Sequence, residues 1–198
     1  ARDEGARHQA MSDRQRAFDL LFRHLLEQVL SQDGPALRIG IFQAEAHAAL
    51  HTLSSHARVR ELALQSQFKP QVNLLGKMGL PVSPTLTGAF DLILFVPSKQ
   101  RRESLGALAH LAGLLQPDGQ VWLCCANDLG AASYEKHLRL LLGRVAVLSK
   151  AHCRLCWSLS PLAPDPLVQA RWLAEAAPTQ VPGTDFKTLP GIYGWNQF

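Results

Sequence analysis

The sequence lacks the features that mark membrane, secreted and serine-hydrolase proteins. No apolar run approaches the roughly 20 residues that a membrane helix needs. No secretory leader precedes the four cysteines, and these form no framework of spaced pairs, so a reducing compartment fits. There is no G-x-S-x-G elbow, and the eight histidines are scattered. We therefore expect a soluble, cytoplasmic protein with no membrane partner.

Metal-ligand patterns are equally sparse. His152, Cys153 and Cys156 have the spacing of half a zinc site. In a strand, however, Cys153 and Cys156 would point to opposite faces, and no second pair completes the set. The adjacent Cys124 and Cys125 have the same difficulty. We interpret the cysteines as small apolar core residues and expect no metal site.

Charge is also scarce. Charged residues make up 18% of the 198 residues, below the usual quarter, as expected for a surface that is partly covered by something else. The net charge of +4 permits a nucleic-acid partner without establishing one. The hydrophobic fraction of 47% is that of a globular protein with a core, and it excludes disorder.

Strand-like and helix-like patterns alternate along most of the chain. A helix is predicted from the capping pair Ser12 and Gln15 to Leu30. Alternation predicts an α/β, Rossmann-like sheet, mostly parallel, with helices on both faces. The short link between the last strands makes the final strand antiparallel, as in methyltransferase-type sheets. Strands are predicted at 37–42, 59–64, 90–96, 121–126, 144–148 and 154–159, helices at 43–53, 101–115 and between Asn127 and Gly143, a turn at 117–119 and a long loop at 65–89.

The amino-acid composition changes near residue 160. Half of the 12 prolines follow that point, which argues against a core of helices there. We expect a domain over 1–160, and over 161–198 a linker with a short helix near 168–176 and a hairpin-like piece, GTDFKTLPGIYGWNQF. The apolar end suggests a cut through a longer protein, so the expected continuation is a catalytic domain absent from this chain.

The turn after the first predicted strand lacks glycine. Rossmann-type folds need glycine there because only a bare backbone lets a cofactor approach the helix N-terminus. Here LRIGIF runs into Gln43-Ala44-Glu45-Ala46, and Glu45 would repel an anionic group. Gln65-Ser66-Gln67 stands where an acidic partner for a ribose is expected. The sequence predicts a degenerate site and no cofactor in this fragment.

Basic residues gather in two stretches. One follows the central predicted strand, at the sheet edge where open α/β folds bind ligands. The other lies within 135–154, where Glu135 is the single acid. Both stretches are candidates for phosphate contacts, and the alternative is an ordinary solvated face. The RNA-binding candidates are Lys99, Arg101, Arg102, Lys136, Arg139, Arg144, Lys150 and Arg154.

Three stretches resemble one family, the ribosomal RNA guanine-N2 methyltransferases of the small-subunit methyltransferase C and large-subunit methyltransferase G type. They are FDLILFVPSKQRRESLGALAHLAGLLQPDGQVWLCCAND, SKAHCRLCWSL and GTDFKTLPGIYGWNQF. The likeness covers about 90–198 and is to the amino-terminal half of those proteins. Residues 1–89 match in general layout only.

The resemblance implies a first half that has lost its S-adenosylmethionine site. In that family a second, catalytic half carries an Asp-x-Gly-x-Gly loop and an Asn-Pro-Pro-Phe-type motif. Neither occurs here, and Val96-Pro97-Ser98-Lys99 stands at the second motif's place, so no catalytic residue carries over. The fragment is expected to be inactive alone, with S-adenosylmethionine bound in the missing half and rRNA or a ribosomal subunit as partner.

Three functions remain open at this point. The first is a non-catalytic RNA-recognition domain, and the second is a purely structural domain that packs on its own C-terminal catalytic half without touching RNA. The third is a small methyltransferase in its own right, which would have to bind S-adenosylmethionine without a glycine loop.

Overall fold

The computed structural model describes residues 11–159 and 163–188. Its main sheet consists of β1 (Leu37–Phe42), β2 (Val59–Gln65), β3 (Val82–Ser83), β4 (Phe90–Phe95), β5 (Leu115–Ala126), β6 (Val145–Lys150) and β7 (Cys153–Ser158). The strand order is β3-β2-β1-β4-β5-β7-β6. All pairs from β3 to β5 are parallel, and β7 is antiparallel to both β5 and β6. This confirms the predicted methyltransferase-type sheet.

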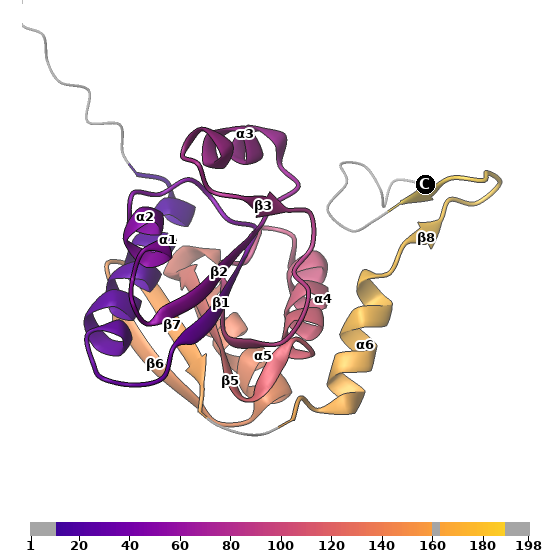
Figure 1. The fold of residues 1–198 in the computed structure, drawn as a ribbon. Helices are drawn as coiled ribbons and strands as arrows, with labels where there is room; N and C mark the ends of the chain where they lie inside the picture. The colour runs from indigo at the N-terminus through magenta and orange to yellow at the C-terminus, as the bar shows by residue number, and fades with distance from the viewer. Residues whose placement is uncertain (1–10, 160–162, 189–198) are drawn as a thin grey trace, which may run out of the picture.

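Helices cover both faces of the sheet (Figure 1). The first core is built on α1 (Asp13–His24), the π-helical turn η1 (Leu25–Leu30) and α2 (Ala49–Ser54), with Leu75 from α3 (Lys69–Lys77). The second core is built on α4 (Arg101–Ala112), α5 (Ala131–Leu142) and α6 (Pro166–Ala176). Within the described ranges, none of the helices has the length and apolarity that a membrane crossing requires.

The central strand β4 is buried on both faces, as its continuous apolar run predicts. Leu92 and Leu94 belong to the first core, whereas Ile93 and Phe95 belong to the second. Successive side chains of a strand point to opposite faces, so a strand between two helical layers is apolar at its buried positions, whereas the half-buried Asp91 near its start pairs with Arg60.

The helix expected over 43–53 is shorter than predicted. α2 begins only at Ala49, because the chain after β1 is held to the end of β2. The backbone N–H of Ala44 donates to the carbonyl of Gln65 at 2.7 Å. The expected loop at 65–89 contains the helix α3 and the two-residue strand β3, although glycine and proline residues in this stretch favoured a loop. Both differences come from contacts distant in sequence.

The turn expected at 117–119 is part of a strand. β5 starts at Leu115 and stays beside β4, with a shift of register between Phe90 and Leu92. A Cβ on Gly119 would lie 2.6 Å from the carbonyl oxygen of Phe90. Glycine is therefore used here for close backbone approach at a bulge rather than for chain reversal.

Beyond the main sheet, α6 packs against α4. Asp165 caps its N-terminus by accepting from the backbone N–H groups of Leu167 and Val168. A small hairpin follows, formed by β8 (Thr179–Gln180) and β9 (Lys187–Thr188). The rest of the hairpin-like piece, residues 189–198, lies outside the described residues. Whether 161–198 leads to a further domain stays a prediction.

The four cysteines are core residues divided between the two faces of the sheet. Cys124 and Cys153 lie in the first core, and Cys125 and Cys156 lie in the second. Burial raises the pKa of Cys125 and of Cys156 to about 12. The prediction that Cys153 and Cys156 point to opposite faces is confirmed, so these thiols cannot share one ion.

We expect acid to destabilise the fold through His24. This imidazole packs against both Trp122 and Trp157, with ring centroids 5.3 and 5.2 Å away, and burial lowers its pKa below 6.5. The unfolded chain therefore binds the proton more tightly than the folded one. Stability falls as pH drops through 6.5 towards the lower folded pKa.

The measurement is the melting temperature between about pH 7.5 and 5. His24→Phe should reduce this dependence without abolishing it, because burial also lowers the pKa of His47 and of His137. His51→Phe, which changes an exposed histidine of α2, should leave it intact. Equal slopes in the wild type and His24→Phe would show that other groups cause the loss.

Candidate functional site

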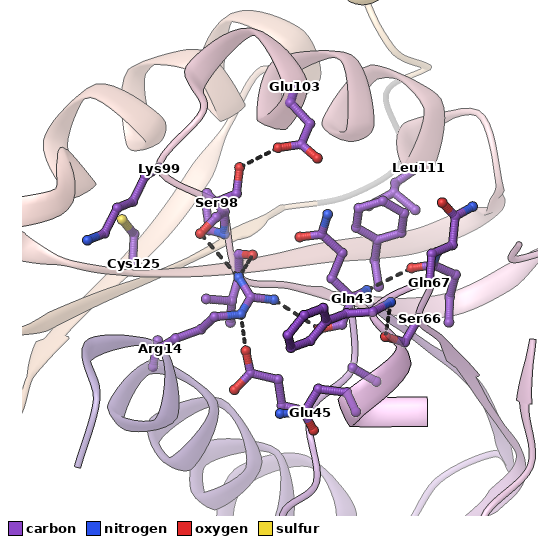
Figure 2. Close-up of a pocket in the computed structure, with 18 of the residues that line it drawn as sticks. Arg14, Gln43, Glu45, Ser66, Gln67, Ser98, Lys99, Glu103, Leu111 and Cys125 are labelled. Carbon is purple, nitrogen blue, oxygen red and sulfur yellow. Dashed lines mark hydrogen bonds and ion pairs between the residues drawn. The ribbon is translucent and has the colours of Figure 1, made fainter. Parts of the chain in front are cut away.

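A cavity lies at the carboxyl ends of the parallel strands, where the strand order reverses between β1 and β4. Open α/β sheets bind their ligands at this switch point. The cavity has a volume of about 750 Å³, which is within the range of small-molecule pockets. Its walls are the first turn of α1 and the segments that follow β1, β2 and β4 (Figure 2).

Arg14 spans the switch point. It projects from the first turn of α1, and its Nη2 donates to the carbonyl of Gln43 after β1 at 2.9 Å. Its Nη1 donates to the carbonyl of Val96 after β4 at 2.8 Å. Its Nε donates to the carboxylate of Glu45, and this ion pair is largely buried, with side-chain exposures of 25% and 20%. One guanidinium thus joins the two strand ends and neutralises the acid between them, as Figure 2 shows.

Three of the N–H groups after β1, those of residues 43, 44 and 46, are already bonded within the chain. The backbone N–H of Gln43 donates to the side-chain carbonyl of Gln65 at 2.9 Å, and that of Ala44 to the backbone carbonyl of Gln65. The backbone N–H of Ala46 donates to Gln71 Oε1 at 2.8 Å. Gln43 has a φ of 50°, the left-handed conformation that a glycine usually supplies. Two side-chain amides and one backbone carbonyl therefore accept from three of the donors that an anionic ligand would use.

These contacts test whether the residues fit S-adenosylmethionine, the cofactor that the fold implies. Its carboxylate needs free donors at this turn, and the three N–H groups of residues 43, 44 and 46 are taken. Its methionine part would share the switch point with the Arg14 guanidinium and the Glu45 carboxylate. The residues after β2 offer amides and a hydroxyl rather than an acid for a ribose. The residues present do not fit the group.

The loop after β4 is fixed to the helices behind it. Ser98 Oγ donates to Glu103 at 2.7 Å, and the backbone N–H of Ser98 donates to Ser104 Oγ at 3.0 Å. Tyr134 OH donates to the carbonyl of Ser98 at 3.5 Å. The neighbouring Lys99 is exposed at the rim. The hydrogen-bonded loop after β4 therefore holds Lys99 in an exposed position.

The first basic stretch is brought together at one end of α4. Arg101 Nη2 is 3.0 Å from His137 Nε2 of α5, and Arg102 donates to the carbonyl of Glu175 in α6 at 2.8 Å. Lys99 immediately precedes these two arginines. The first group of RNA-binding candidates therefore lies where α4, α5 and α6 contact one another.

The second basic stretch is divided. Arg139 and Arg154 share the carboxylate of Glu135, at 3.1 and 2.8 Å. Arg144 immediately precedes β6 and Lys150 is the last residue of this strand, so the length of β6 separates them. Across the part of the chain that the structure describes, the candidates that are exposed and form no ion pair include Lys99, Lys136, Arg144 and Lys150.

Sequence reasoning missed Arg14, although a signal was present. The first turn of a helix favours acidic side chains because its unpaired N–H groups carry partial positive charge. A basic residue two positions after the cap Ser12 works against that preference, so it needs another partner. The partners, Gln43, Glu45 and Val96, are distant in sequence, which is why the residue pattern alone did not reveal them.

Comparison with known proteins identifies the fold. No family model matches this chain, and no curated protein matches it. Among solved structures, it is similar to the 16S rRNA N2 G1207 methyltransferase of T. thermophilus, which was solved with AdoMet and guanosine, at a TM-score of 0.58 and 17% identity. The match covers 85% of this chain and 47% of that one, so this chain spans about half of its length.

Two further solved structures agree. A SAM-dependent O-methyltransferase from Thermotoga maritima has a TM-score of 0.52 and 11% identity, over 73% of this chain and 66% of that one. A ribosomal protein L11 methylase from Lactobacillus delbrueckii subsp. bulgaricus has a TM-score of 0.50 and 17% identity, over 74% and 78%. At these identities the likeness establishes a Rossmann-like methyltransferase fold, and function has to be argued from the site.

Proposed function

We propose that this chain is a non-catalytic RNA-recognition domain of an S-adenosylmethionine-dependent rRNA guanine-N2 methyltransferase. The observation that carries the non-catalytic part is the switch point, where Arg14 and Glu45 form an ion pair and three N–H groups after β1 are bonded internally. A catalytic domain would have to break these contacts before it could hold the cofactor. In this proposal S-adenosylmethionine belongs to a second, C-terminal domain.

Support for RNA recognition comes from charge at the same edge of the sheet. Lys99 is exposed beside the cavity, and Arg101 and Arg102 begin the helix that follows it. The chain carries a net charge of +4, which favours approach to a polyanion. The T. thermophilus protein, a 16S rRNA methyltransferase, offers a parallel for the whole protein. The proposed arrangement is a recognition domain over 1–160 and a connecting segment over 161–198.

A purely structural domain is the second candidate, and exposed apolar side chains favour it. Leu167 and Leu173 of α6 are 81% and 42% exposed, and Phe186 of the small hairpin is 75% exposed. Such residues would be buried if the C-terminal catalytic half packed on them. In that case this fragment would self-associate and bind no RNA in a salt-dependent manner.

The test is a pair of titrations on the 198-residue chain. With S-adenosylmethionine we expect no heat and no rise in melting temperature, since a ligand of the folded state must stabilise it. With a single-stranded rRNA segment we expect binding that weakens between about 50 and 200 mM salt, because each phosphate contact releases counterions. Heat with the cofactor would make this an enzyme domain, and absence of RNA binding at low salt would leave the structural role.

A further inference from the structure

A groove between α4, α5 and α6 gathers arginines. It has a volume of about 370 Å³ and lies on the second face of the sheet, apart from the cavity at the switch point. Arg101 and Arg102 enter it from α4, and Arg171 enters from α6. His137 of α5 lies among them. Three guanidinium groups separated by up to 70 positions in sequence therefore converge on one hollow.

The positive charge of the groove is poorly compensated. Among the described residues, no carboxylate forms an ion pair with Arg101 or Arg171. Glu175 also lines the groove, and its backbone carbonyl accepts from Arg102 at 2.8 Å. Two arginines of the groove, Arg101 and Arg171, thus have no ion-pair partner in the part of the chain that the structure describes. Like charges held close together repel one another, so the arrangement favours an anion that enters from solvent.

His137 connects the groove to the core. Its Nε2 is 3.0 Å from Arg101 Nη2, and its ring contacts Trp172 edge-on at a centroid distance of 5.6 Å. Because Arg101 is a donor, Nε2 must accept and the imidazole is neutral. Burial lowers the pKa of His137, and Arg101 and Arg171 lower it further. The imidazole thereby orients one guanidinium without adding to the repulsion.

We propose that this groove binds phosphate groups of the RNA backbone through Arg101 and Arg171, with Arg102 and His137 as positioning residues. Guanidinium groups are planar and donate in pairs, which suits phosphate oxygens. The exposed cations Lys99 and Lys136 stand two positions before Arg101 and one position before His137 in sequence. Further cations close in sequence to the groove residues favour a chain of phosphates over a single small anion. The inference rests on the proposed RNA recognition and names the surface that performs it.

The experiment measures RNA affinity of the 198-residue chain over a range of salt. The test variant is Arg101→Gln/Arg171→Gln, and both side chains are exposed, so the fold is expected to survive. The matched control is Arg60→Gln, which removes a 59% exposed arginine near the start of β2, towards the opposite edge of the sheet. We expect about tenfold weaker binding for the double variant and a salt slope reduced by about 1.4, at roughly 0.7 per phosphate contact. The control should stay within about twofold.

A second readout follows the imidazole of His137 by NMR. RNA should shift its ring signals in the wild type, and polyglutamate at equal charge should displace the RNA poorly if phosphate is what the groove recognises. Equal displacement would mean that an acidic peptide is the partner and would overturn the assignment to RNA. If the wild type binds RNA but the double variant binds equally well, the groove proposal is wrong while RNA recognition stands. If the wild type binds no RNA, the proposed function fails as well.

Discussion

Arg14→Ala should lower the free energy of unfolding by about 2–3 kcal/mol, because it leaves buried polar groups without their partners. The carboxylate of Glu45 would lose its ion pair in a largely buried place. The carbonyls of Gln43 and Val96 would lose their guanidinium donors. For a protein of 198 residues this corresponds to a melting temperature lower by about 4–12 °C. Differential scanning calorimetry measures both quantities.

The controls distinguish the cost of leaving buried groups unpaired from the cost of losing one ion pair. Arg23→Ala removes an ion pair with Asp19 that is 46% and 34% exposed, and such pairs contribute less than about 1 kcal/mol. Arg14→Ala/Glu45→Gln should recover part of the loss, because no unpaired carboxylate remains. If Arg14→Ala costs no more than Arg23→Ala, the guanidinium does not hold the strand ends together.

Arg14→Ala also bears on the cofactor. We expect the variant to remain unable to bind S-adenosylmethionine, since the N–H groups of Gln43, Ala44 and Ala46 stay bonded to glutamine side chains or to the β2 backbone. Heat of binding in the variant but not in the wild type would mean that Arg14 alone blocks a site that is otherwise intact. That outcome would contradict the proposal that hydrogen bonds of the turn after β1 keep this domain from binding the cofactor.

Gly106→Ala should destabilise the packing of α6 on α4 by about 1–3 kcal/mol, the usual cost of overpacking. A Cβ on Gly106 would lie 2.2 Å from the Cβ of Ala176 and 3.4 Å from the carbonyl oxygen of Trp172. The two helices would have to separate, which would expose Trp172, now 2% exposed. Tryptophan fluorescence and hydrogen exchange of residues 166–176 report this movement.

The same substitution elsewhere provides the control. Gly76 also lies within a helix, α3, and a Cβ there meets nothing within 4 Å. Gly76→Ala should therefore stabilise the protein by up to about 1 kcal/mol, the difference in helix propensity. Opposite signs for the two variants are the expected result. If both variants stabilise the protein, α6 is not closely packed on α4 in solution.

The local sequence pattern was sufficient to predict most of the helices and strands. The run LRIGIF predicted β1 at its observed bounds, and FDLILFV predicted a strand that is buried on both faces. The missing glycine after β1 was visible in the letters Gln43-Ala44-Glu45. These inferences succeeded because side-chain periodicity and the steric freedom of glycine act between residues that are neighbours in the chain.

The remaining features depended on contacts between distant residues. The segment at 43–48 is alanine-rich and favours helix, yet the hydrogen bond between Ala44 and Gln65 holds it out of one. The Pro-Asp-Gly signal at 117–119 became a bulge because β4 passes close to Gly119. In both places a tertiary contact outweighed a local preference of a few tenths to about 1 kcal/mol per residue.

The sequence by itself determined the α/β class, the antiparallel final strand and the lack of a glycine turn, because each is written in the order and spacing of neighbouring residues. Only the tertiary structure decided that Arg14 closes the switch point, at carbonyls 29 and 82 positions away. It also decided that Arg101 and Arg171 share a groove and that the other basic stretch is divided. Charges act through space, so the sequence shows which ones exist, and only the packing of helices on the sheet decides which of them meet.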